Sequence, residues 1–243
     1  MTAAATRYAA AAADAHLHTL TDLQDQPADI DDRAELRRAY SESLVRSTTG
    51  RIYYEELLAS APRNRCPFCG HRDVATLDHQ LPKASYPLLA ITPDNLVPAC
   101  WDCNHRKNDA VPTTAATQTL HPYFESAEGS RWLFARVVSL DPAAVIFFAD
   151  PGPIFSETMR ARISHQFNQF RLAALYGTQA ARQMAGERRL LANLRQEGGP
   201  PAVVKHLRDV AGSWAASSLN CWQHAMYEAL AADPGYVGHG HGP

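Results

Sequence analysis

Apolar residues follow a helical period in the first quarter of the chain. Three of them recur every four positions and predict an amphipathic helix within residues 33–60: Leu36, Tyr40 and Leu44. Gly50 predicts a break in this helix. The alanine run at residues 9–13 favours helix but offers little surface to bury, so we expect a helix that frays or needs a partner.

The pattern changes to β-rich runs in two places. Residues 74–81 and 95–99 contain β-branched and apolar side chains and predict two strands joined by a long, proline-containing loop. Residues 131–140 and 143–149 predict a second pair of strands, separated by an Asp-Pro turn. We expect this second hairpin to pack on the module built from the first two strands.

Helical spacing returns in the C-terminal half. Three helices are predicted, over residues 156–175, 178–195 and 202–230. Ser156 is a suitable N-cap for the first helix, and Gly177 is a suitable stop. The Gly-Gly-Pro-Pro run that begins at Gly198 separates the second predicted helix from the third. Gly212 is a candidate position for a break within the third helix. Residues 235–243 are rich in Gly and His and predict a disordered tail.

Four of the five cysteines occur as two Cys-x-x-Cys pairs, Cys66 with Cys69 and Cys100 with Cys103. Two such pairs can form a tetrahedral zinc site, which cross-links loops that a short hairpin could not hold in place alone. This use of cysteine favours a reducing compartment and argues against a disulfide framework. Cys221 is the remaining cysteine, and its helical surroundings predict a buried structural thiol.

The segment between the pairs contains residues that suit metal-assisted phosphodiester hydrolysis. His79, as a neutral imidazole, can take a proton from an attacking water. Asp78 and Asn104 offer oxygen ligands, which Mg²⁺ or Mn²⁺ prefers. Lys83, Arg106 and Lys107 are cations that could contact phosphates, although ordinary solvated charges would look the same. A purely structural zinc knuckle is the alternative interpretation of the cysteines.

The order of these residues resembles the zinc-supported HNH, or ββα-metal, endonucleases. The family pattern appears here as Cys66 and Cys69, Asp78-His79 with Pro82, Asn95-Leu96, and finally Cys100, Cys103, Asn104 and Lys107. The predicted strand, loop and strand, followed by a helix from Trp101 that stops before Pro112, are consistent with a ββα shape. The resemblance covers roughly a fifth of the chain.

The resemblance implies a role for each of these residues. His79 would be the general base, and Asp78 and Asn104 would hold a catalytic Mg²⁺ or Mn²⁺, with His105 as the reserve ligand. Asn95 would tie the long loop to its neighbours and help to orient His79. The four cysteines would hold a structural Zn²⁺. Single-metal sites of this family cut one strand at a time, which implies nicking, or double-strand cleavage by a homodimer.

A second resemblance concerns partners. Residues 82–87, Pro-Lys-Ala-Ser-Tyr-Pro, are similar to a segment in the HNH partner of an ATPase in Septu-type anti-phage systems. This similarity implies an effector nuclease of a bacterial defence system with a partner ATPase or sensor protein. The chain itself has no P-loop. The segment LHPYFE resembles a downstream segment of other HNH proteins, so His121 lies either near the site or in ordinary packing.

Composition limits the choice of partner and compartment. The formal net charge of -2 excludes a generally basic nucleic-acid binder, so attraction to DNA, or to RNA, has to come from a local patch. No secretory signal and no apolar run of membrane-spanning length is evident, which predicts a cytoplasmic protein without a membrane partner.

Together these patterns predict a mainly α protein with a small α+β core, in which helices flank a ββα-metal nuclease module with a four-Cys zinc site. The expected divisions are a helical segment at 1–60, the module at 61–113, a β-hairpin with helices at 114–234 and the tail at 235–243. The predicted function is a metal-dependent DNA endonuclease. The alternatives are a catalytically inactive zinc-ordered module that binds nucleic acid or protein, and a stand-alone restriction-type nuclease.

Overall fold

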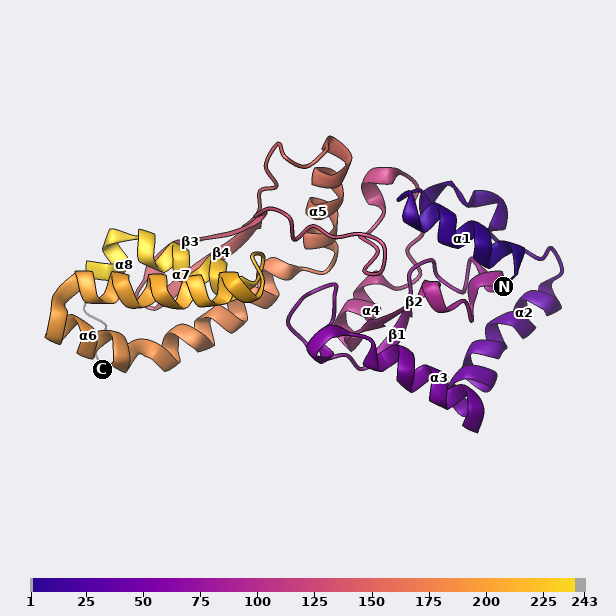
Figure 1. The fold of residues 1–243 in the computed structure, drawn as a ribbon, viewed down its shortest axis with the longest axis horizontal. Helices are drawn as coiled ribbons and strands as arrows, with labels where there is room; N and C mark the ends of the chain where they lie inside the picture. The colour runs from indigo at the N-terminus through magenta and orange to yellow at the C-terminus, as the bar shows by residue number, and fades with distance from the viewer. Residues whose placement is uncertain (1, 239–243) are drawn as a thin grey trace. The chain divides into compact units, whose positions relative to one another are not determined.

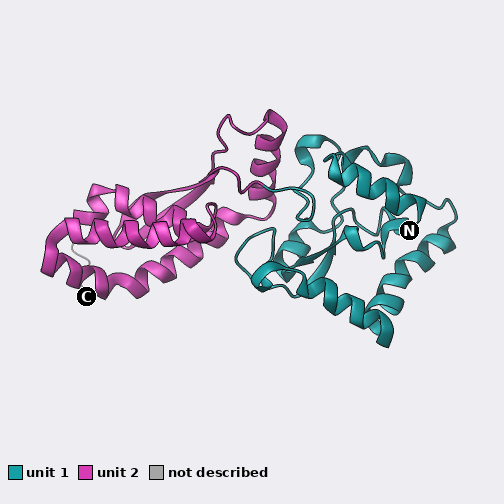
Figure 2. Cartoon of the chain, in the orientation of Figure 1, with its two compact units in different colours: residues 1–126 teal, residues 127–243 magenta. Residues whose placement is uncertain are grey.

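The computed structural model describes residues 2–238, which belong to two compact units, residues 1–126 and 127–243 (Figures 1 and 2). Unit 1 thus extends to Ser126. The segment after the module remains in unit 1 because it packs there: His121 is fully buried, and the Tyr123 hydroxyl donates to the Leu96 carbonyl at 2.7 Å. His121 therefore has a packing role.

The centre of unit 1 is the ββα element, whose predicted strands and helix are confirmed with shorter bounds. Strand β1 (Thr76–His79) pairs antiparallel with β2 (Leu96–Ala99), and helix α4 (Trp101–Lys107) follows directly. Pro98 lies opposite Leu77 in the register. A proline is tolerated there because both strands of a two-stranded sheet have one edge without a ladder.

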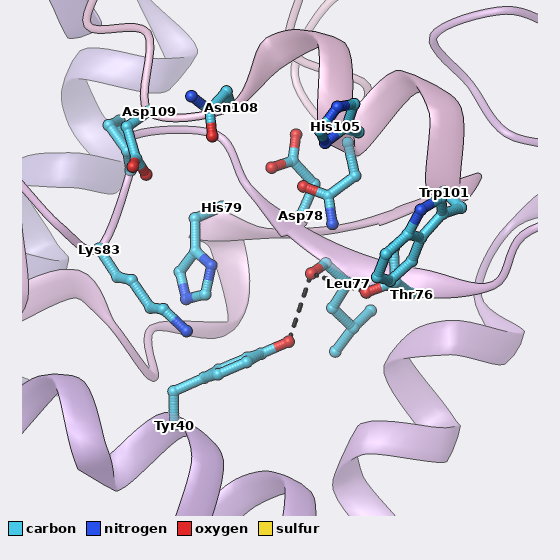
Figure 3. A pocket seen from close by; sticks show the side chains of 12 residues that line it. Tyr40, Thr76, Leu77, Asp78, His79, Lys83, Trp101, His105, Asn108 and Asp109 are labelled. Carbon is cyan, nitrogen blue, oxygen red and sulfur yellow. Dashed lines mark hydrogen bonds between the residues drawn. The ribbon is translucent and has the colours of Figure 1, made fainter.

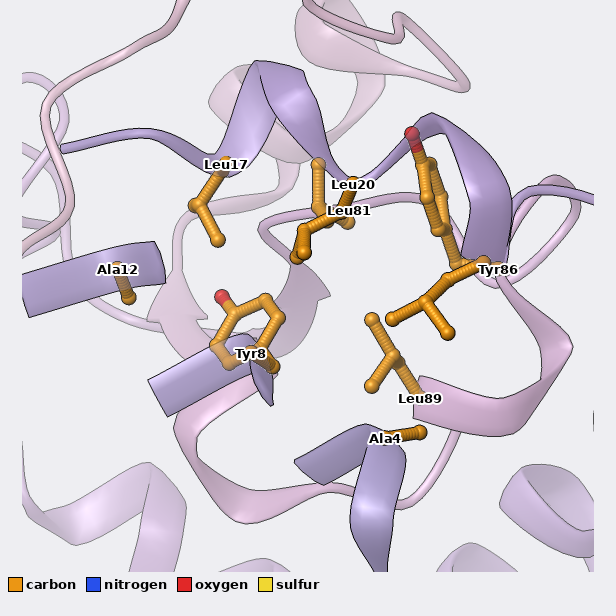
Figure 4. Close-up of a cluster of buried hydrophobic side chains, with 9 residues drawn as sticks. Ala4, Tyr8, Ala12, Leu17, Leu20, Leu81, Tyr86 and Leu89 are labelled. Atoms are coloured by element: carbon orange, nitrogen blue, oxygen red, sulfur yellow. The ribbon is translucent and has the colours of Figure 1, made fainter. Parts of the chain in front are cut away.

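Helix α1 (Ala3–Ala13), which was expected to fray or to need a partner, packs into the core of unit 1. Tyr8 and Ala12 on one of its faces are fully buried. Figure 4 shows these side chains among leucines and a tyrosine contributed by residues 17–23 and by the loop after β1. The cluster of buried residues is Ala4, Tyr8, Ala12, Leu17, Leu20, Leu23, Leu81, Tyr86 and Leu89. Helix α1, which contains the alanine run, and the loop after β1 thus form this core together.

The region predicted as one helix with a break at Gly50 is built differently. Helix α2 (Ile30–Ala39) runs into a π-helical turn (Tyr40–Arg46), and α3 (Thr48–Ala59) begins after the N-cap Ser47. Gly50 lies in the first turn of α3, where an added Cβ would come 1.8 Å from the Ser43 carbonyl oxygen. Its small size permits this close approach, so Gly50 is a packing residue and not a helix stop.

Tyr40, Tyr53 and Tyr54 differ in exposure. Tyr54 is buried with Leu77 and Leu96, and Tyr40 packs against this cluster. Tyr53 is 59% exposed. Short 3-10 turns complete the unit, at Leu17–Thr19, Thr21–Leu23, Pro62–Asn64, Pro87–Leu89, Pro93–Asn95 and Ala115–Thr117.

Unit 2 contains the second hairpin, formed by β3 (Leu133–Leu140) and β4 (Ala143–Ala149). The hairpin packs against α6 (Leu172–Ser217) and α7 (Trp222–Ala232) of the same unit. The prediction of a hairpin is confirmed. Helices α6 and α7 supply its apolar partner surface within the unit, and the expected packing on the nuclease module stays a prediction.

Helix boundaries in unit 2 also differ from the prediction. Helix α5 (Glu157–Gln169) begins at the predicted N-cap, since the Ser156 side chain accepts from the Met159 amide. It ends at Phe170, and Arg171 in the left-handed region (φ 50°) separates it from α6, so Gly177 lies inside a helix. The break predicted at the Gly-Gly-Pro-Pro run is confirmed as a kink at Gly199 (φ 66°), where two helical segments of α6 meet.

Two short helices, α7 and α8, form the end of the described chain. A turn before α7 breaks the last predicted helix, and Cys221 is the N-cap of α7 and only half-buried, which corrects the expectation of a buried thiol within a helix. Helix α8 (Pro234–Gly238) buries Tyr236 and Val237, so the predicted disordered tail is wrong for residues 235–238. Residues 239–243 of that prediction lie outside the described residues. The fold is mainly α with a small α+β core, as predicted.

Candidate active site and metal centre

The four paired cysteines meet in one cluster. Their Sγ atoms all lie within 4.8 Å of one another, and those of Cys69 and Cys100 are 4.0 Å apart. Tetrahedral zinc with Zn–S bonds of about 2.3 Å requires sulfur atoms roughly 3.8 Å apart. All four residues are buried. The donor set and its spacing fit a structural Zn²⁺.

Local turns bring the two pairs together. Gly70 (φ 60°) closes the first knuckle, where its amide donates to the Cys66 carbonyl at 2.7 Å. In the second pair the Cys100 Sγ is the N-cap of α4 and accepts from the Cys103 amide. The first knuckle is tied to α4 by an ion pair between Arg72 and Asp102 at 3.0 Å. The zinc cluster therefore fixes the start of α4 relative to β1.

A pocket of about 290 Å³ lies beside this centre. Five of the predicted site residues line it: Asp78, His79, Lys83, Asn104 and His105. Figure 3 shows Asp78 and His79, from the end of β1, on the same pocket as His105 and Asn108 from the region of α4. Strand and helix thus place a carboxylate, an imidazole and an amide around one space.

Asp78 forms a buried ion pair with Lys107. The Lys107 Nζ lies 3.2 Å from Oδ1 and 3.1 Å from Oδ2 of Asp78, and it donates to the His79 carbonyl at 2.6 Å. Burial raises the pKa of Asp78 to about 6, although the Lys107 charge opposes that shift. Lys107 is 3% exposed, so the predicted phosphate contact does not fit its position.

His79 is held by a single backbone acceptor. Its Nε2 lies 2.9 Å from the Ala90 carbonyl oxygen, which can only accept, so Nε2 carries the proton in the neutral ring. Nδ1 is then the nitrogen with a lone pair. Burial lowers the pKa of His79 to about 3, which keeps the ring neutral near pH 7. The Tyr40 ring contacts it edge-on, with centroids 4.6 Å apart.

Asn95 binds the loop that presents Ala90. It is fully buried, and its Nδ2 donates to the carbonyls of Leu81 and Leu89 at 3.0 and 3.1 Å. Its Oδ1 accepts from the Leu81 amide at 2.7 Å. Both ends of the loop are therefore joined through one side chain, and Leu89 directly precedes the residue that holds His79.

The remaining predicted residues differ in position. Lys83 is half-buried at the pocket with its Nζ 4.2 Å from the Tyr40 ring centroid, and burial lowers the pKa of Lys83. Arg106 is exposed on α4 and lies outside the pocket lining. Asn104 is half-buried at the pocket, and His105 is exposed there.

Tyr40, Trp101 and Asp109 are among the pocket residues that had no part in the predicted site. The Tyr40 hydroxyl donates to the Leu77 carbonyl at 3.3 Å, which brings a residue from the N-terminal helices to β1. The spacing of Tyr40 in the sequence predicted only that this residue belongs to the apolar face of a helix. Trp101 and Asp109 flank the motif residues on α4, and this adjacency was the available signal.

The fit of the pocket to a divalent ion rests on the type of donor atom. The buried Oδ2 of Asp78 has no hydrogen-bond partner of good geometry among the described residues, and the Lys107 ammonium 3.1 Å away compensates its charge. Asp78 and Asn104 present the hard oxygen donors that Mg²⁺ and Mn²⁺ prefer.

The match to known proteins agrees with this geometry. Residues 66–110 match the family model of the HNH endonucleases. The four-cysteine cluster in this segment is consistent with the zinc-supported type of HNH module.

Over more of its length the chain is similar to Protein ea31 of Escherichia phage lambda. The two are 27% identical over 217 residues, which cover 82% of this chain and 72% of the phage protein. No solved structure matches the chain. Among residues 2–238, no helix combines the length and apolar character needed to cross a bilayer.

Proposed function

We propose that this protein is a metal-dependent endonuclease that hydrolyses phosphodiester bonds in DNA. The observation that supports it is the shared pocket of Asp78, His79 and Asn104 beside the four-cysteine cluster, within the segment that matches the HNH endonucleases. The nucleic-acid substrate is implied by that class. The choice of DNA over RNA belongs to the proposal.

His79 is the general base in this proposal. Its Nε2–H is used in the bond to the Ala90 carbonyl, so Nδ1 takes the proton from the attacking water. The low pKa that burial produces keeps Nδ1 unprotonated at neutral pH. Asn95 contributes by holding the loop that carries Ala90, and it does not touch the reacting atoms.

Asp78 and Asn104 hold Mg²⁺ or Mn²⁺ in this proposal. His105, at the same pocket, is the alternative ligand to Asn104. When bound, such an ion stabilises charge on the phosphate and the leaving oxygen. Lys83 contacts a phosphate from the pocket wall, and Arg106 from the exposed side of α4. The zinc held by the cysteines has no direct part in the reaction and keeps α4 in place.

Plasmid cleavage tests the proposal. Purified protein is incubated with supercoiled plasmid and Mg²⁺, Mn²⁺ or EDTA, beside His79→Ala and the matched control His16→Ala, whose exposed ring lies outside the pocket. We expect metal-dependent nicking by the wild type and by His16→Ala, and a loss of at least 100-fold in His79→Ala. Equal cleavage by the two variants would contradict the assignment of the base.

A zinc-ordered binding module without catalysis is the competing function. It predicts that wild type binds DNA in a gel-shift assay while no metal supports cleavage, and that His79→Ala binds equally well.

The finer predictions concern partners and location. A homodimer, a partner ATPase or sensor, a role in anti-phage defence and a cytoplasmic location stay predictions from the sequence. Light scattering on the purified protein tests the dimer. Phage plating efficiency with the protein expressed alone or with the product of a neighbouring gene tests the defence role, which requires protection that disappears in His79→Ala.

A further inference from the structure

Trp101 has an exposed indole at the pocket of the proposed nuclease site. It is 70% exposed and lines the same pocket as Asp78 and Asn104. Single exposed aromatic residues are ordinary on protein surfaces, and Tyr53 is one in this unit. Trp101 differs because of its place. Figure 3 shows its ring bordering the pocket, on the other side of the labelled residues from Lys83.

The backbone that carries Trp101 is rigidly held. Trp101 is the first residue of α4 and lies between Cys100 and Cys103, two members of the zinc cluster. The Cys100 Sγ also caps the helix through the Cys103 amide. A large planar side chain on a fixed backbone loses little freedom when a flat ligand covers it, which suits a stacking surface.

Few cations at this pocket can contact phosphates, so a contact with a base would add to the affinity for nucleic acid. Asp78 neutralises the buried cation Lys107, and the Nζ of Lys83, which lines the pocket, lies 4.2 Å from the Tyr40 ring centroid. Two nearby arginines are also paired, Arg65 with Asp73 and Arg72 with Asp102. The chain as a whole has a formal net charge of -2. Attraction to phosphates therefore depends mainly on Lys83 and Arg106 here.

We propose that Trp101 is a stacking platform for the nucleobase next to the scissile phosphate, and that the site consequently prefers unpaired DNA to duplex DNA. In a duplex both faces of each base are covered by neighbouring bases, so stacking on an indole requires that a base first leave the stack. An unpaired base has a free face. The inference rests on the proposed nuclease function, since it names the form of substrate for the same pocket.

The first test compares KM and kcat of wild type, Trp101→Ala and Trp101→Phe on a single-stranded oligonucleotide and on the same sequence as a duplex. Stacking on an aromatic side chain predicts a rise in KM for the single strand of roughly 5- to 150-fold in Trp101→Ala, with a much smaller change in kcat. Trp101→Phe retains most of the affinity. The KM for the duplex changes little.

Trp214→Phe is the matched control, because this tryptophan of unit 2 is also partly exposed and lies outside the pocket. Bound zinc and melting temperature are measured for every variant to show that the fold is retained. Equal KM values for wild type and Trp101→Ala on both substrates would overturn the proposal. A similar rise on single strand and duplex would also overturn it, because it would show a general loss of the site.

A second measurement does not depend on cleavage. Fluorescence of the His79→Ala protein is titrated with an oligothymidylate in the presence of Mg²⁺. Stacking predicts quenching that disappears in His79→Ala/Trp101→Phe and persists in His79→Ala/Trp214→Phe. Quenching without cleavage by the wild type would retain the platform and reject the nuclease. Cleavage by the wild type with the same quenching in both double variants would retain the nuclease and reject the platform.

Discussion

The Lys107 ammonium lies within 3.2 Å of both carboxylate oxygens of Asp78, and both side chains are buried. The pair places a positive charge next to the carboxylate that we propose as a metal ligand. Lys107 also donates to the His79 carbonyl, so one side chain from α4 positions both consecutive residues of β1. It acts on the site through these contacts rather than through the substrate.

Removal of Lys107 is therefore expected to destabilise the protein strongly. Lys107→Met leaves the Asp78 carboxylate buried without its partner, which costs about 3–5 kcal/mol in the free energy of unfolding. It also raises the pKa of Asp78 further above its present value of about 6. A folded-state pKa above the unfolded value means that stability decreases as pH rises through the folded pKa. The loss should thus be larger at pH 8 than at pH 5 in denaturant unfolding.

The partner variant provides the control for this prediction. In Lys107→Met/Asp78→Asn the buried charge is absent, so the dependence on pH between 5 and 8 should become flatter than in Lys107→Met. A double variant that keeps the steep dependence would show that another group titrates.

His79 gives the opposite dependence on pH. Its folded-state pKa of about 3 lies below the ordinary value of 6.5, so the unfolded chain binds the proton first and stability decreases as pH falls below 6.5. Between pH 7.5 and 5.5 this costs about 1.5 kcal/mol relative to a variant without the imidazole. His79→Gln should therefore lose less unfolding free energy over this interval than the wild type. Parallel curves for the two proteins would contradict a buried, neutral His79.

Loss of one zinc ligand should prevent unit 1 from folding stably. Structural zinc contributes about 10–16 kcal/mol in small zinc domains, which is comparable to the whole stability of an ordinary domain. Cys103→Ser should reduce bound zinc well below one ion per chain and abolish cleavage. Zinc content and circular dichroism are the measurements. Cys221→Ser is the control because this thiol lies outside the cluster, and it should retain zinc and activity.

Substitution of Asn95 and of Asn104 should distinguish a residue that positions the site from a residue that binds the metal. Asn95→Ala leaves the Leu81 amide and two carbonyls without their partner, which costs about 3 kcal/mol, and activity should fall because the loop holding His79 loosens. Asn104→Ala removes a half-buried side chain and should change stability by less than about 1 kcal/mol while raising the Mg²⁺ concentration needed for cleavage. Equal metal requirements in Asn104→Ala and the wild type would exclude Asn104 as a ligand.

The predicted parts of the site share a local origin. The two Cys-x-x-Cys pairs, Asp78-His79 and Asn104 are separated by short segments whose turns and strands have clear signals, such as the prolines of the loop and Cys100 before α4. The two strands and the helix are therefore determined by residues that are close in the sequence. The cysteines meet once these elements form. The knuckle and the ββα order could be predicted for this reason.

Long-range packing explains the errors. Helix α1 was expected to fray or to need a partner because alanines bury little, and Tyr8 enters a core completed by Leu81 and Leu89 from a loop far along the chain. Gly50 was interpreted as a helix break, yet it lies against Ser43 within a folded-back pair of helical segments. The sequence did not predict that α6 and α7 cover the second hairpin, because its apolar residues do not specify which surface covers them.

The sequence by itself determined the secondary structure of the module, its cysteine cluster and the chemical types of the site residues, because these depend on interactions between residues close in the chain. Only the tertiary structure decided that Lys107 is buried against Asp78, that Tyr40 packs on His79, and that Trp101 stays exposed at the pocket. Those outcomes depend on which surfaces exclude water when distant segments meet, and residue type and spacing do not encode that burial locally.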